Sequence, residues 1–127
     1  MTRIGVVNDD TVFLDMMEAV LKDHGWETMV YREGHSAFAA LKADPPDLII
    51  LDIRLEEPET GWTLLELLTL ERQTRSVPVI VCSAALLDLR AHEELLRQYG
   101  IKILPKPFDI DALYRCVEES LIGSSAS

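Results

Sequence analysis

Four polar residues end or follow short apolar segments, and their side chains suit a divalent cation and a phosphoryl group. They are Asp9, Asp52, Ser83 and Lys106. Carboxylate oxygens are hard ligands of the kind that Mg²⁺ prefers, and a carboxylate can also accept a phosphoryl group as a nucleophile. An ammonium group and a hydroxyl group can bind phosphoryl oxygens. The residue types therefore predict phosphoryl chemistry, provided that the fold brings them together.

The segments that carry these residues are typical of buried parallel strands. The segments at 3–8, 48–52, 77–82 and 101–104 are short, mostly apolar and separated by helical patterns. A further short strand is predicted at 27–31. Ligands of such sheets bind beyond the carboxyl ends of the strands, so we expect all four polar residues at one edge.

Helical spacing of apolar residues predicts one helix after each strand. The helices are expected at residues 13–24, 36–43, 61–74, within 86–99, and from 110 onward with Asp109 as its cap. This alternation predicts an α/β fold with a five-stranded, doubly wound parallel sheet, five helices and the flavodoxin-like order 2-1-3-4-5. We expect one domain at residues 1–122 and a flexible tail at 123–127.

Composition narrows the classes of function. The 127 residues are 48% hydrophobic and 27% charged, as in a soluble single domain. We find no membrane-spanning stretch and no secretory signal, so we expect a cytoplasmic protein with two reduced thiols, Cys82 and Cys116. The net charge of −10 disfavours direct binding to nucleic acid and leaves a basic protein partner open.

In their order and spacing, these motifs resemble the response-regulator receiver domains of two-component signalling, in particular single-domain, chemotaxis-regulator-like ones. The resemblance covers nearly the whole chain and rests on the segments 6–10, 47–52, 77–84 and 104–108. It implies that Asp52 is the phosphoacceptor. It also implies that Mg²⁺ is bound by Asp9, Asp52 and the backbone carbonyl of Arg54. Ser83 and Lys106 would contact the phosphoryl group and switch the domain.

The resemblance further implies that a histidine kinase or a histidine phosphotransfer protein donates the phosphoryl group. Because no effector domain follows in these residues, we expect the signal to leave through the face of the fourth helix, fifth strand and last helix. Candidate contact residues there are Arg90, Glu94, Arg97, Lys102 and Arg115. The downstream protein is not indicated by the sequence, a homodimer is one candidate, and these residues could equally be solvated.

Four features depart from the family pattern, and two of them, Asn8 and Ile103, bear most on function. Asn8 replaces the first member of the usual acidic pair, so we expect weaker Mg²⁺ dependence, although its amide oxygen is an additional candidate ligand. Ile103 stands where the family often has a Tyr or Phe that swings inward with the switch hydroxyl. An isoleucine cannot reproduce that polar tip or that swing.

Functions from other classes remain as alternatives. A phosphorylation-independent scaffold is favoured by Asn8 and Ile103, and it is opposed by the intact set of four polar residues named above. A phosphatase with an aspartate nucleophile would need a second acid where Arg54 stands, so we do not expect an enzyme. A flavodoxin would need a phosphate loop after the first strand, where the acidic segment 8–10 would repel a phosphate.

Overall fold

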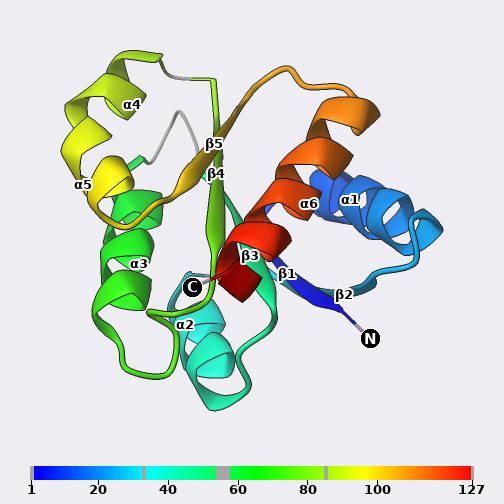
Figure 1. Ribbon diagram of the computed structural model, residues 1–127, viewed down its shortest axis with the longest axis horizontal. Coiled ribbons are helices and arrows are strands. Elements are labelled where there is room, and N and C mark those ends of the chain that lie inside the picture. The colour runs from blue at the N-terminus through cyan, green and yellow to red at the C-terminus, as the bar shows by residue number, and fades with distance from the viewer. Residues whose placement is uncertain (1, 33, 54–57, 85, 127) are drawn as a thin grey trace.

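A central parallel sheet organises the chain. The computed structural model describes residues 2–32, 34–53, 58–84 and 86–126. The strands are β1 (Arg3–Val7), β2 (Glu27–Tyr31), β3 (Leu48–Asp52), β4 (Val79–Ser83) and β5 (Lys102–Pro105), in the order β2-β1-β3-β4-β5 (Figure 1). The predicted five-stranded parallel α/β sheet and its strand order are confirmed.

Helices cover both faces of this sheet. They are α1 (Thr11–Asp23), α2 (Gly34–Ala43), α3 (Pro58–Leu70), α4 (Leu86–Ala91), α5 (Glu93–Gln98) and α6 (Ile110–Ala126). Figure 1 shows α1 and α6 on one face, and α2, α3, α4 and α5 on the other. Within the described residues, no helix combines the length and the apolar character that crossing a membrane would need.

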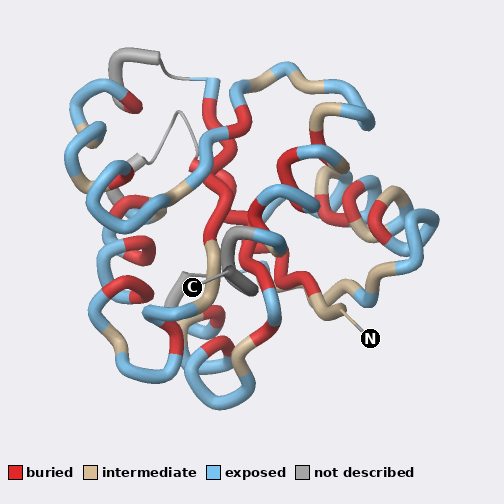
Figure 2. Tube along the Cα trace, viewed as in Figure 1, coloured by how far each residue is buried: buried red, intermediate tan, exposed pale blue. Residues whose placement is uncertain are grey.

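The two faces of the sheet form two separate hydrophobic clusters. Ile49 and Leu51 of β3 point into the cluster under α2 and α3, whereas Leu48 and Ile50 point into the cluster under α1 and α6. Figure 2 shows this burial along the strands and the inner sides of the helices. All five positions of β3 and of β4 are buried, which explains their nearly continuous apolar sequences.

The described residues contain six helices rather than the predicted five, because the helix predicted within 86–99 is divided at His92. The backbone of His92 has φ −110° and ψ 15°, outside the α-helical region. Its imidazole ring stacks on the indole ring of Trp62 in α3, with centroids 3.8 Å apart and planes inclined by 7°. The helix restarts with Glu93 and Glu94, whose negative charges suit a helix N-terminus.

The boundaries of two other helices also differ from those predicted. α3 starts at Pro58, a residue favoured in the first turn of a helix, and it ends at Leu70 rather than at 74. The buried Thr74 hydroxyl donates a hydrogen bond to the carbonyl oxygen of Leu68 at 2.8 Å, which closes the turn after the helix. α6 extends to Ala126, past residue 122, and the division into a domain and a tail stays a prediction.

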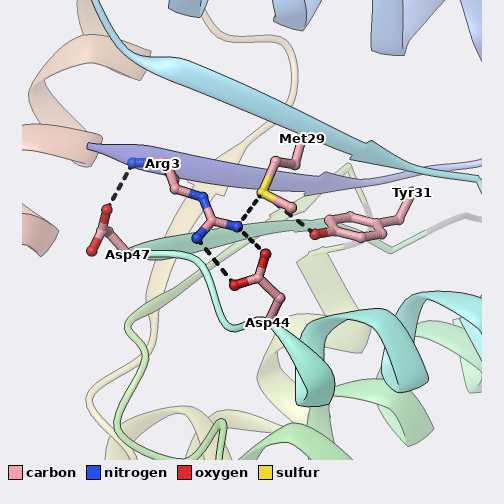
Figure 3. Close-up of polar contacts among 5 residues, drawn as sticks. All are labelled: Arg3, Met29, Tyr31, Asp44 and Asp47. Atoms are coloured by element: carbon pink, nitrogen blue, oxygen red, sulfur yellow. Dashed lines mark hydrogen bonds and ion pairs between the residues drawn. The ribbon is translucent and has the colours of Figure 1, made fainter. Parts of the chain in front are cut away.

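At the start of β1, Arg3 connects the sheet to the segment around the end of α2 (Figure 3). Its guanidinium group contacts the Asp44 carboxylate at 2.7 and 3.2 Å, and its backbone N–H donates to Asp47 Oδ2 at 2.7 Å. The hydrogen bond and the charge of Arg3 lower the pKa of Asp44. Arg3 Nη2 also lies 2.8 Å from the sulfur of Met29, which Tyr31 approaches from the other side.

Gly5 in β1 is needed for close packing of the sheet. A methyl group at this position would lie 3.1 Å from Tyr31 Cε2 and 3.2 Å from Pro46 Cγ. We expect Gly5→Ala to lower the free energy of unfolding by about 1–3 kcal/mol, because the core must move to accommodate the added atom. Urea unfolding followed by circular dichroism measures this difference, and an unchanged midpoint and slope would contradict it.

The two cysteines are free and buried, as predicted for reduced thiols. Burial, and then the negative charge of Asp52, raises the pKa of the Cys82 thiol to about 12. Burial also raises the pKa of Cys116. Because the thiolate is the reactive form, both side chains are protected from thiol reagents in the folded state.

We therefore expect Ellman's reagent to react slowly with the native protein at about pH 8 and rapidly with the chain unfolded in urea. The raised pKa of Cys82 stabilises the fold below the ordinary thiol pKa of 9.0, and this contribution is lost as the pH rises toward about 12. A Cys116→Ser variant isolates Cys82, and rapid release of chromophore from the native form of this variant would contradict the burial.

Candidate functional site

The predicted site residues lie at the carboxyl-end edge of the sheet. Asp52 is the last residue of β3 and Ser83 the last of β4, whereas Asp9 and Lys106 follow β1 and β5. The register pairs Val7 with Leu51 and Asp52 with Cys82, so these strands end at nearly the same level. The sheet therefore brings residues that are far apart in the sequence to a common edge.

Asp52 is the centre of this site. Its side chain is buried, with 8% of the residue exposed, and its Oδ1 forms an ion pair with Lys106 Nζ. The Lys106 side chain is 29% exposed and passes over the ring of Phe13, with Nζ 4.9 Å from the ring centroid. A buried carboxylate needs such a partner, because loss of hydration disfavours an unpaired charge.

Asn8 holds the other oxygen of the same carboxylate. Its Nδ2 donates a hydrogen bond to Asp52 Oδ2 at 2.9 Å, and its Oδ1 accepts one from the backbone N–H of Asp10 at 3.0 Å. Its own backbone N–H donates to the carbonyl oxygen of Tyr31 at 3.0 Å. From the sequence Asn8 is a candidate metal ligand only, and its contact with Asp52 was not predicted. The amide group itself could have indicated this contact, because an asparagine can donate a hydrogen bond to a carboxylate and an ionised aspartate cannot.

Ser83 and Lys106 are joined through the backbone. The Lys106 N–H donates to the Ser83 carbonyl oxygen at 3.0 Å, so the end of β4 fixes the start of the loop that carries the lysine. Ser83 is only 1% exposed. The backbone N–H of Ile53 donates to the carbonyl oxygen of Cys82 at 2.9 Å, which ties the residue after Asp52 to the same strand. Asp52, Ser83 and Lys106 are thus held by one hydrogen-bonded framework.

The structure places the other predicted residues that it describes as follows. Asp9 is exposed beside Asn8, and Arg54 lies outside the described residues. Ile103 of β5 is 40% exposed. The five predicted contact residues are all exposed; they are Arg90, Glu94, Arg97, Lys102 and Arg115. Lys102 also pairs with Glu119, with Nζ 3.5 Å from the carboxylate oxygen Oε2. Their exposure is compatible with partner binding, which stays a prediction.

The side chains at this edge fit a magnesium ion. Mg²⁺ is commonly bound through one or two carboxylates and keeps several water ligands. Asp9 and Asp52 would provide these carboxylates. No group of three or more His, Cys, Asp or Glu side chains that could hold a metal ion occurs among the described residues, at this edge or elsewhere. The amide nitrogen of Asn8, however, is directed at one oxygen of Asp52.

An open apolar hollow lies beside the lysine. It has a volume of about 380 Å³ and is lined by Phe13, Met16, Ala84, Lys106, Pro107 and Phe108. Met16 is exposed, and Val12 on the same helix is 77% exposed. The hollow joins the first turns of α1 to the loop after β5, so an apolar surface borders the charged site.

Comparisons with known proteins place this site in a family. The family model described as a response regulator receiver domain matches residues 4–118. The DNA-binding transcriptional regulator NtrC of Salmonella typhimurium is 31% identical over 118 residues, which cover 93% of this chain and 24% of that protein. The chain thus spans about a quarter of the length of this curated relative.

Solved structures show the same fold. NtrX from Brucella abortus has a TM-score of 0.83 and 29% identity, over 99% of this chain and 28% of that one. The receiver domain of the sensor histidine kinase PA1611 from Pseudomonas aeruginosa has a TM-score of 0.78 and 25% identity, over 94% of this chain and 97% of that one. That structure has a magnesium ion coordinated in its active-site cleft. The present chain belongs to the response-regulator receiver domain family.

Proposed function

We propose that this chain is a phosphorylation-switched receiver that accepts a phosphoryl group on Asp52 and passes the signal on through protein contacts. The observation that carries the proposal is the buried Asp52 carboxylate, paired with Lys106 at the sheet edge of a receiver-family domain. In this proposal the chain is a phosphoryl acceptor in the cytoplasm. It is neither an enzyme nor a nucleic-acid-binding protein, in keeping with its net charge of −10.

The proposed reaction forms one bond and breaks one bond. A carboxylate oxygen of Asp52 attacks the phosphorus atom, and the bond from phosphorus to the nitrogen of a phosphohistidine breaks, leaving an aspartyl phosphate and a histidine that takes up a proton. Lys106 is already at the carboxylate and offsets the negative charge of the phosphoryl oxygens. The Ser83 hydroxyl, from the end of the neighbouring β4, would donate a hydrogen bond to them.

Mg²⁺ would reduce the repulsion between the carboxylate and phosphoryl oxygens. Asp9 and Asp52 would bind it, and the backbone carbonyl of Arg54 and the Asn8 amide are further candidate ligands. The product adds a charge of about −1.5 to −2 at the sheet edge. New contacts of this charge with Lys106 and Ser83 supply the free energy that shifts the domain toward its active state.

The apolar hollow supports docking of the donor protein. A histidine kinase or a histidine phosphotransfer protein must bring its phosphohistidine to Asp52, and α1 borders that approach. The exposed Val12 and Met16 and the partly buried Phe108 provide an apolar contact surface next to the charged site. Burial of such side chains on binding would stabilise the encounter.

For output we propose the face of α4, α5, β5 and α6, which carries the five exposed contact residues named above. Its mixed charges suit a downstream protein or a second copy of the chain. A phosphorylation-independent scaffold is the second candidate, and the Asn8–Asp52 hydrogen bond favours it, because this bond occupies a carboxylate oxygen.

The test is intact mass spectrometry after incubation with acetyl phosphate, with and without Mg²⁺. We expect one phosphoryl adduct on the wild-type chain, enhanced by Mg²⁺, and none on Asp52→Asn, because an amide is not a competent nucleophile here. Circular dichroism of both proteins establishes that they are folded. If a folded wild-type chain gains no adduct from acetyl phosphate or from a purified phosphorylated histidine phosphotransfer protein, the scaffold is the better account.

A further inference from the structure

The orientation of the Asn8 side chain is determined by its surroundings. A backbone N–H can donate only to an acceptor, so the amide oxygen of Asn8 must face the N–H of Asp10. The amide nitrogen then faces Asp52 Oδ2, at 2.9 Å. Asn8 is 6% exposed, so water cannot readily take over either contact. The amide is therefore a fixed donor to the phosphoacceptor.

This donor and Lys106 hold the two oxygens of one carboxylate separately. Lys106 pairs with Oδ1 and Asn8 binds Oδ2, which fixes the rotation of the Asp52 side chain without any metal ion. A carboxylate in place of the amide could not donate at neutral pH, and it would add a negative charge next to Asp52. Repulsion between the two carboxylates would favour a bound cation.

We infer that Asn8 is a positioning residue for Asp52 and that its amide competes with Mg²⁺ for Asp52 Oδ2. The inference rests on the proposed function only in taking Asp52 as the residue that the metal contacts. A metal ion that takes Oδ2 as a ligand meets the amide N–H of Asn8 on the same oxygen, and the partial positive charge of that N–H opposes the cation. The same amide that orders the carboxylate in the resting domain therefore weakens the binding of Mg²⁺.

The alternative role for Asn8, as a ligand of the metal, predicts the opposite result for one variant. Asn8→Ala removes the amide without adding charge, so competition predicts tighter binding of Mg²⁺ by about two- to tenfold, the equivalent of one hydrogen bond. A ligand role predicts weaker binding. Asn8→Asp removes the donor and adds a carboxylate, and we expect it to tighten Mg²⁺ binding by at least about tenfold.

The experiment is a titration with MgCl₂ of the wild type, Asn8→Ala and Asn8→Asp, followed by ¹H–¹⁵N NMR and by the midpoint of thermal unfolding. Asp9→Asn in each background is the matched control, and it should weaken binding if the signal comes from this edge. Without Mg²⁺ both Asn8 variants should unfold at lower urea concentration than the wild type. Weaker Mg²⁺ binding by Asn8→Ala, or no Mg²⁺-dependent change in any of the proteins, would overturn the inference.

A second measurement needs no variant. The side-chain amide resonances of Asn8 in the wild type should shift as Mg²⁺ is added, because a cation on Oδ2 weakens the hydrogen bond to Asp52. Resonances unchanged at saturation would overturn the competition. Acetyl phosphate labelling distinguishes this failure from failure of the proposed function. If Asp52 gains an adduct and Asn8→Ala binds Mg²⁺ more weakly, the proposed function stands and the inference about Asn8 fails. If Asn8→Ala binds Mg²⁺ more tightly but no adduct forms, the inference stands and the proposed function fails.

Discussion

The burial of the Asp52 carboxylate is the constraint on which the site depends. Removing a carboxylate from water costs roughly several kcal/mol, and this penalty is offset only when the charge is paired and both oxygens are satisfied. Lys106 and Asn8 meet this requirement from two different loops. The positions of the loops after β1 and β5 are therefore coupled to a single side chain at the end of β3.

The parallel sheet makes this coupling possible. Side chains in the middle of β3 alternate between two apolar clusters, and the strand turns polar only at its last residue. The lysine is fixed by its backbone bond to Ser83 at the end of the adjacent β4, so displacement of Asp52, Ser83 or Lys106 acts on the others. The stack of His92 on Trp62 joins α3 to the break between α4 and α5.

The sequence predicted the features that depend on local patterns. Apolar segments identified the strands, and the rule for carboxyl ends of parallel strands placed Asp52 and Lys106 at one edge. The break at His92 was not predicted, because local propensity favours one continuous helix and gives no sign of the ring thirty residues away in α3 on which His92 stacks. The end of α3 likewise depends on a hydroxyl, that of Thr74, finding a carbonyl group six residues earlier. The donor role of Asn8 depends on side-chain rotation, which no spacing encodes.

The charge at the sheet edge explains why an amide at position 8 matters. Asp52 and Lys106 together are neutral, and Asn8 adds a dipole without a charge, so the buried part of the site is balanced before any ligand arrives. An acid at position 8 would leave a net negative charge there, which would destabilise the buried site and favour a bound cation. With the amide, and in the proposed function, the need for further positive charge arises mainly when a phosphoryl group is added to Asp52. In that proposal Asn8 stabilises the resting site without adding to its negative charge.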